Sequence, residues 1–189
     1  MKEIIYLLHI DIRRFLGSRR FYLVCAGMIL IQMLSFFAMV VLKTYTVTEI
    51  FDNLMSGTCS AVLLLWMLPL VPFALSYAED QESNVLKYIE VRSTPWRVLV
   101  VRFFSSCLSA FLCVVLSFVA FMLIVRVMGH AWTDPELYQD IEQGGYNELL
   151  RSGNAAGFLL FFVLDRGFTA AMMGASAFFM SMFTRDTFI

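Results

Sequence analysis

Four long apolar runs limit what this chain can fold into. They lie near residues 21–42, 58–77, 103–125 and 156–183. Each run is close to the roughly 20 mainly apolar residues that a helix needs to cross the hydrocarbon core of a bilayer, or longer. Hydrophobic residues make up 60% of the 189 residues, whereas a soluble domain is about half apolar. The runs predict an all-α polytopic membrane protein with about four transmembrane helices in one transmembrane domain, 21–189.

The residues before the first run, 1–20, predict a separate amphipathic helix. Ile4, Leu8, Ile12 and Phe15 recur at helical spacing on one side, and basic and polar residues line another. The pattern is typical of a helix that lies in the membrane interface with its basic side against anionic headgroups. A soluble helix packed on the rest of the protein is the alternative. Because a long apolar run follows within a few residues, we expect the interfacial helix.

The placement of basic residues predicts the orientation, because Lys and Arg prefer the cytoplasmic side of short loops. Ten of the 14 basic residues fall in the N-terminal segment, in 78–102 or in the tail. Only Lys43, Arg126 and Arg151 fall on the other side, where the loop 128–155 is rich in acids. The N-terminus, the segment 78–102 and the C-terminus are therefore expected in the cytoplasm, and the loop 128–155 outside.

The segment 78–102 separates two very apolar runs with a charged, helical pattern. Its first part, 79–92, begins with three acids and ends with basic residues, which complements a helix dipole. The letters "STPW" (93–96) then supply a cap, a first-turn proline and an interfacial tryptophan, so the third span is expected to start in the cytoplasm. A docking element and a solvated loop whose charges only enforce topology both fit this composition.

Two stretches resemble a known family. The basic amphipathic leader before the first span, and "YAEDQESNVLKYIEVRSTPWRVLVVRF" (77–103) between the second and third, resemble the permease subunit of the ATP-binding-cassette (ABC) type 2 family. Small bacterial exporter permeases are the most similar members. The tail "GFTAAMMGASAFFMSMFTRDTFI" (167–189) is similar to their fourth span and following inner turn. The resemblance covers most of the chain through degenerate motifs. It implies a multi-pass exporter subunit of the bacterial cytoplasmic (inner) membrane.

The same resemblance implies partners and a contact surface. In that family the leader is an elbow helix, and the segment between the second and third spans is a coupling helix that docks on a separate ATPase subunit. ATP and magnesium would bind that ATPase, and a second permease chain would form a homodimer or heterodimer with this one. The family usually has six spans, so we expect a chain without the last two. The implied ATPase contacts are Glu79, Asp80, Glu82, Leu86, Lys87, Tyr88 and Arg92.

The fourth run contains a seam of small residues at three-four spacing: Gly167, Ala170, Gly174, Ala177 and Ser181. We call these five residues the small-residue seam. Small side chains let membrane helices approach closely. The seam predicts either packing within one subunit or an interface between subunits.

Asp165 and Arg166 interrupt the same run toward its outer end. A charge at the bilayer centre costs about 2.5–3.5 kcal/mol on insertion scales, so this pair needs partners, a wet cavity or a boundary position. One interpretation places both residues in the external vestibule of a translocation path. The other starts the span near Gly167 and makes the preceding "GFLLFFVL" an interfacial or re-entrant helix.

The sequence offers little for catalysis or metal binding. Cys25, Cys59, Cys107 and Cys113 lie in or beside apolar runs without C-x-x-C spacing, so we expect small buried hydrophobes ahead of disulfides or metal ligands. No phosphate-binding loop occurs, so this chain is not expected to bind ATP in that manner. No Ser/His or paired-Asp constellation suggests catalysis, so an enzyme is not expected. Neither a resident cofactor nor a nucleic-acid partner is expected. The alternative function is a non-transporting scaffold or immunity protein that binds another membrane protein through its helix faces.

Overall fold

The computed structural model describes residues 2–40, 46–48, 50, 65, 67–70, 95–132, 148–149 and 152–183. The regular elements in these ranges are helices: α1 (Lys2–Leu16), α2 (Arg19–Val40), the 3-10 turn η1 (Leu68–Leu70), α7 (Pro95–Val127) and α9 (Ala155–Phe183). Three of them, α2, α7 and α9, are long and apolar enough to cross a membrane. The described chain is therefore all-α with membrane-spanning helices, as the apolar runs predict.

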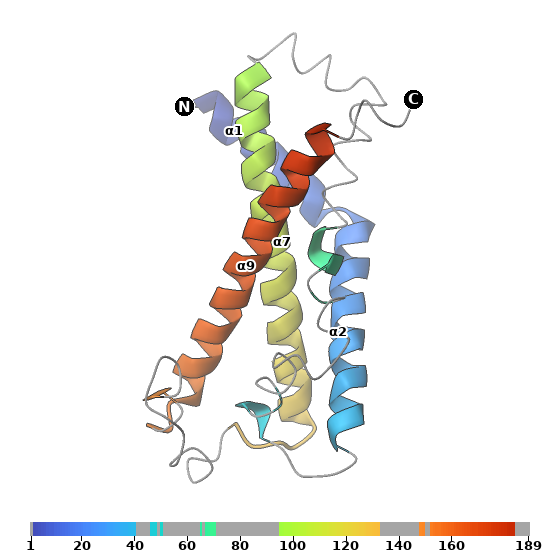
Figure 1. The fold of residues 1–189 in the computed structure, drawn as a ribbon, viewed down its shortest axis with the longest axis vertical. Helices are drawn as coiled ribbons and strands as arrows, with labels where there is room; N and C mark the ends of the chain where they lie inside the picture. The colour runs from blue at the N-terminus through green and yellow to red at the C-terminus, as the bar shows by residue number, and fades with distance from the viewer. Residues whose placement is uncertain are drawn as a thin grey trace.

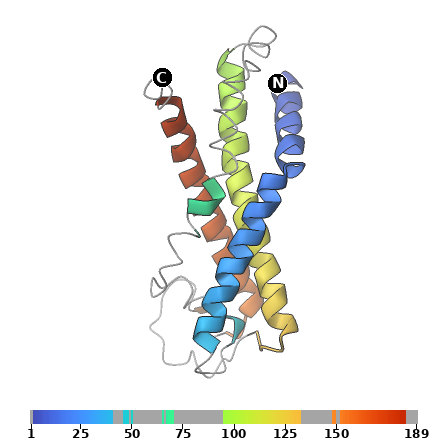
Figure 2. The same cartoon turned by 90° about the vertical axis from the view of Figure 1, so that its right-hand side faces the viewer.

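The central element is α7, which contacts α1, α2, α9 and η1, and its contact with α9 is the most extensive. Figure 1 shows α9 crossing α7 at a slant, with α2 on the other side of α7. In Figures 1 and 2, α1 lies at the same end of the bundle as the start of α7 and the end of α9. We call this the α1 end. The end of α7 and the start of α9 lie at the opposite end.

The break between α1 and α2 occurs at Gly17 and Ser18. The Gly17 amide donates to the Arg13 carbonyl (3.0 Å), and the Ser18 amide donates to the Phe15 carbonyl (3.1 Å), which closes the last turn of α1. A Cβ at Gly17 would lie 3.1 Å from the Arg13 carbonyl oxygen, so a glycine suits this tight turn. The chain then starts α2 in a new direction, and α1 is left beside the first half of α7 (Figure 1).

Aromatic side chains fill the interior between the long helices. Phe36 of α2 meets Phe121 of α7 edge to face, with ring centroids 6.3 Å apart. Phe118 of α7 meets Phe162 of α9 in the same way, also at 6.3 Å. Phe36, Phe118 and Phe121 are fully buried. Edge-to-face pairs add to the stabilisation that burial of the rings supplies, so these contacts hold α7 between its two neighbours.

The outward surface of the bundle is apolar as well. Leu23, Leu30 and Leu34 of α2 are 59–70% exposed, although a soluble helix places polar residues on its outer side. In the most apolar stretch of α2, only 33% of the residues are buried inside the protein, and the fraction in α9 is the same. A helix that is apolar all round but buried on one side only needs another apolar environment, and a bilayer supplies it.

The second apolar run, near 58–77, lies mostly outside the described residues. Where it is described, the chain forms the turn η1, which contacts α2, α7 and α9 and buries Pro69. The sequence predicts a kink here from Pro69 and Pro72, because each proline removes a backbone donor. A 3-10 turn at Leu68–Leu70 is compatible with such a kink.

The start of α9 depends on a side-chain cap. Asn154 Oδ1 accepts a hydrogen bond from the Gly157 amide (2.9 Å), and the preceding Gly153 has a φ of 71°. We expect Asn154→Ala to lower the free energy of unfolding by about 1 kcal/mol, because the cap is lost. Thermal unfolding of the protein in detergent measures this change. Asn154→Asp keeps the accepting oxygen and should match the wild type; an alanine variant as stable as the aspartate variant would contradict the role of the cap.

Candidate functional site

The predicted ATPase contact, 79–92, lies outside the described residues. Its continuation is described, because α7 begins at Pro95. Helix α7 has 33 residues and is about 50 Å long at 1.5 Å per residue. The hydrocarbon core is only about 30 Å thick, so about two-fifths of α7 extends beyond it if the helix stands upright. The first turns of α7 at the α1 end are therefore the direct link between the segment 79–92 and the membrane-spanning part.

A buried ion pair joins these first turns to α1. Arg102 Nη1 lies 3.5 Å from Asp11 Oδ1. Ser105, one turn further along α7, donates from Oγ to Asp11 Oδ2 (3.3 Å). Asp11 is 8% exposed, Arg102 4% and Ser105 not at all. We call these three residues the α1–α7 clamp. Charges this buried need a partner, so the pair specifies where α1 lies along α7.

The Arg102 side chain is turned inward against α1, where Asp11 offers a carboxylate across the helix pair. From its position just before the third apolar run, Arg102 is expected at the level of the headgroups, and that depth stays a prediction. The sequence contains a signal that could have identified Asp11, since it is an acid flanked by Ile10 and Ile12 within a basic amphipathic segment. The pairing itself depends on which faces of the two helices meet.

Helix α1 has a second face that does not pack on α7. Phe15 is buried, while Ile5 and Tyr6 are about two-thirds exposed and Arg13 and Arg14 are exposed. One face thus contacts the bundle, and the rest presents apolar and basic side chains together. This combination suits a helix at a headgroup boundary. The interfacial position of α1 stays a prediction.

The described part of the small-residue seam forms the contact between α9 and α7. A Cβ at Gly167 would lie 2.8 Å from the Phe111 ring, and a Cβ at Gly174 would lie 3.2 Å from Ala110 Cβ. Ser106 donates from Oγ to the Gly174 carbonyl (3.2 Å). Ala170 is buried and Ala177 is half-buried, while the Ser181 side chain lies outside the described part. Small residues therefore let α9 approach α7 within one chain.

Asp165 and Arg166 lie near the middle of α9, which runs without a break from Ala155 to Phe183. Arg166 Nε lies 3.7 Å from Asp165 Oδ2, and the Arg166 guanidinium carbon lies 5.2 Å from the centroid of the Phe162 ring. Both side chains are partly exposed, Arg166 by 30% and Asp165 by 45%. The ion pair and the cation–π contact lower the cost of placing both charges in an apolar helix. Their part in a translocation path stays a prediction.

A cavity of about 720 Å³ lies between the second half of α7 and the first half of α9, near the opposite end. Val119, Met122, Leu159 and Val163 are among its apolar lining residues, and Arg126 supplies a charge. Arg126 is held by a hydrogen bond from Nη1 to the His130 carbonyl (2.9 Å), and its guanidinium carbon lies 5.6 Å from the centroid of the Trp132 ring. Among the described lining residues, Arg126 is the one cation, and apolar walls with an oriented cation fit a hydrophobic molecule that carries an anionic or polar group.

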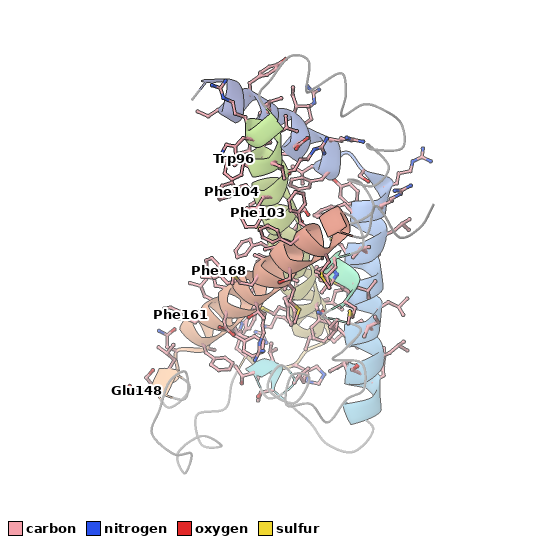
Figure 3. The ribbon with its side chains drawn as sticks, turned by 45° about the horizontal axis from the view of Figure 1, so that its top comes forward. Trp96, Phe103, Phe104, Glu148, Phe161 and Phe168 are labelled. Atoms are coloured by element: carbon pink, nitrogen blue, oxygen red, sulfur yellow. The ribbon has the colours of Figure 1, made fainter. Side chains whose placement is uncertain are left out.

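Aromatic residues mark the outward side of α7 and α9. Figure 3 shows Trp96 and Phe104 of α7, and Phe161 and Phe168 of α9, pointing away from the bundle. Each of the four is more than half exposed. Trp96 lies at the α1 end of α7, where a tryptophan is expected at a membrane boundary. This side of the molecule is available to lipid or to another membrane helix.

Neither a protein-family model, nor a curated protein, nor a solved structure matches this chain.

Proposed function

We propose that this chain is the membrane-spanning permease subunit of an ATP-driven ABC exporter in the bacterial cytoplasmic membrane. Separate ATPase subunits dock on 79–92 from the cytoplasm and hold the ATP and magnesium. A second permease chain, identical or related, completes the path for the substrate. The proposal rests on the resemblance of 77–103 to a coupling segment and on the charge asymmetry that favours the cytoplasm for this segment.

The observation that carries the proposal is the α1–α7 clamp. The segment 79–92 leads within three residues into α7, and the first turns of α7 are joined to α1 by Asp11, Arg102 and Ser105. A displacement of 79–92 is therefore passed along α7 and, through the clamp, to α1 and α2. A solvated loop that only enforced topology would need no such connection.

The substrate binds at the opposite end of the bundle, away from the α1 end. The cavity between α7 and α9 has apolar walls, and its lining ends at Leu164, next to Asp165. Movement of α7 relative to α9 changes the shape of this cavity, because both helices form its walls. An ATPase that moves the first turns of α7 can thereby open or close a space that takes up an amphipathic or apolar substrate.

A copurification experiment tests the docking surface. We expect that the triple substitution Glu79→Lys, Asp80→Lys and Glu82→Lys abolishes copurification of the ATPase subunit expressed with this chain, because three attractive charges become repulsive. The added lysines lie in the segment 78–102, which already carries basic residues and is expected in the cytoplasm. Membrane insertion should therefore be unchanged. The measurement is the amount of ATPase recovered per permease chain from detergent-solubilised membranes.

The matched control neutralises three acids of the other polar loop: Glu136→Gln, Asp140→Asn and Glu142→Gln. This variant should retain the ATPase at the wild-type level. Equal recovery of ATPase with the 79–82 variant and with the wild type would rule out the proposed docking surface.

The alternative, a scaffold or immunity protein, requires helix faces that bind a partner. In the described part of the seam, Gly167 and Gly174 already pack on α7 of the same chain, so a partner would have to use the outward aromatic side of α7 and α9. The resemblance of 77–103 to a coupling segment favours the transport subunit, which we retain as the proposed function.

A further inference from the structure

We propose that Cys25, Met28 and Cys113 form a binding site for a soft metal ion, Cu(I), between α2 and α7. We call these residues the three-sulfur site. The proposal does not depend on the transport function, because it rests on the sulfur atoms and their surroundings alone.

The Cys113 sulfur of α7 lies beside two sulfur atoms of α2, although the two helices are distant in the sequence. Cys113 Sγ of α7 lies 3.4 Å from Cys25 Sγ and 3.9 Å from Met28 Sδ, both of α2. Cys25 and Met28 are three residues apart, so they share one face of α2. Both cysteines are free thiols. Met28 and Cys113 are fully buried, and Cys25 is partly exposed, which leaves an entry route from the surface of α2.

The distances from the Cys113 sulfur to the sulfur atoms of Cys25 and Met28 are close to those in a three-coordinate metal site. Metal–thiolate bonds of about 2.3 Å in a trigonal plane place the sulfur atoms about 4.0 Å apart. The Cys113–Met28 distance is already close to this value, and the two thiols need to separate by about 0.6 Å on the same geometry.

The donor set selects the metal. Thiolate and thioether ligands favour Cu(I), whereas structural zinc takes four ligands from Cys, His and carboxylates. Within the part of the chain that the structure describes, no three His, Cys, Asp or Glu side chains come together. Among the described side chains the Met28 thioether is the third donor, and a thioether favours copper over zinc.

Two buried polar residues support the assignment, Gln32 on the same face of α2 as Met28 and Ser117 beside the thiols. Gln32 follows Met28 by one turn on the same face of α2 and is fully buried, yet neither of its amide atoms has a hydrogen-bond partner. A buried amide without a partner is costly, so it points to a ligand or an ordered group nearby. Ser117 donates from Oγ to the Cys113 carbonyl (2.7 Å), one turn along α7, and thereby adds a second polar group beside the thiols.

Binding is a substitution without electron transfer. Each cysteine loses its thiol proton to solvent and forms one Cu–S bond, and the Met28 thioether donates a lone pair. Copper remains Cu(I) throughout. Two protons are released for each ion bound, so the affinity rises with pH.

The test uses the full chain, purified in detergent under reducing, anaerobic conditions and titrated with Cu(I) against a chromogenic Cu(I) chelator. We expect one Cu(I) per chain and, by X-ray absorption, three sulfur neighbours. Cys25→Ser and Cys113→Ser should each weaken binding by at least the roughly 100-fold that loss of a supporting group can cause. Met28→Leu should reduce the sulfur neighbours from three to two. Ag(I) should compete, and Zn(II) should not.

Cys107→Ser is the matched control, because Cys107 is also a half-buried free thiol on α7 and lies outside the site. It should bind Cu(I) as the wild type does. Alanine replaces serine at positions 25 and 113 if thermal unfolding shows that serine disturbs the fold. Equal Cu(I) binding by the Cys25→Ser/Cys113→Ser double variant overturns the proposal. So do nitrogen or oxygen neighbours around copper in the wild type, or a Cys25–Cys113 disulfide in protein isolated from cells.

Discussion

Replacing Arg102 with alanine is expected to lower the free energy of unfolding by about 3–5 kcal/mol. The substitution removes the Arg102 guanidinium from beside Asp11, a carboxylate that is only 8% exposed. Ser105 still donates one hydrogen bond to Asp11, but a neutral hydroxyl does not replace the positive charge. A loss of this size is a large part of the stability of a typical domain, so we also expect less folded protein in the membrane fraction.

The measurement is denaturant unfolding in detergent, with Arg13→Ala as the matched control. Arg13 is an exposed arginine on α1, and its replacement should change stability by no more than about 0.5 kcal/mol. The double variant Asp11→Leu/Arg102→Met removes both charges and should recover most of the lost stability, because apolar side chains then replace both members of the buried pair. If Arg102→Ala and Arg13→Ala have equal stability, the ion pair does not join α1 to α7.

Replacing Gly174 with leucine is expected to separate α9 from α7 and to lower the free energy of unfolding by about 1–3 kcal/mol or more. Even a Cβ at this position lies 3.2 Å from Ala110 Cβ and 3.4 Å from the Ser106 carbonyl oxygen, so a larger side chain has no space. The hydrogen bond from Ser106 Oγ to the Gly174 carbonyl would be lost with the separation. Gly167→Leu should act in the same direction, because its Cβ would meet Phe111 at 2.8 Å.

Gly27 supplies the control for both substitutions. It lies within α2, and a Cβ there would meet nothing within 4 Å. Gly27→Leu should leave stability unchanged or raise it by up to about 1 kcal/mol, because glycine is a poor helix former. Thermal unfolding in detergent compares the three variants. If Gly174→Leu were as stable as Gly27→Leu but failed to associate with a second chain, the seam would be a subunit interface instead.

The positions of the long helices follow from local properties of the sequence. The run near 156–183 lies within α9, and the third run, near 103–125, lies within α7. The letters "STPW" predict a helix start at Pro95, and the described part of α7 begins there. Apolar length and capping act within one segment, so both can be recognised without knowledge of the fold. The three-four spacing of the small-residue seam can also be recognised within one segment. It predicts a close helix contact but does not identify the partner helix.

The contacts that define the candidate sites could not be predicted in this way. The α1–α7 clamp joins positions 11 and 102, and the three-sulfur site joins positions 25, 28 and 113. Helical periodicity indicates which residues share a face, but the meeting of two faces depends on how all the helices pack. Gln32 is a further example, because its burial without a partner depends on the surrounding bundle rather than on its neighbours in the sequence.

The most direct test of the account asks what residue 87 touches in the living cell. A photo-crosslinking amino acid is placed at Lys87, within the proposed docking segment, and at Ser152, which is exposed near the opposite end, as the control. Illumination of intact cells followed by mass spectrometry identifies the crosslinked partner. The account predicts an ABC ATPase subunit crosslinked to position 87 and none to position 152. Labelling of position 87 from outside the cell, or crosslinks to lipid alone, would contradict it.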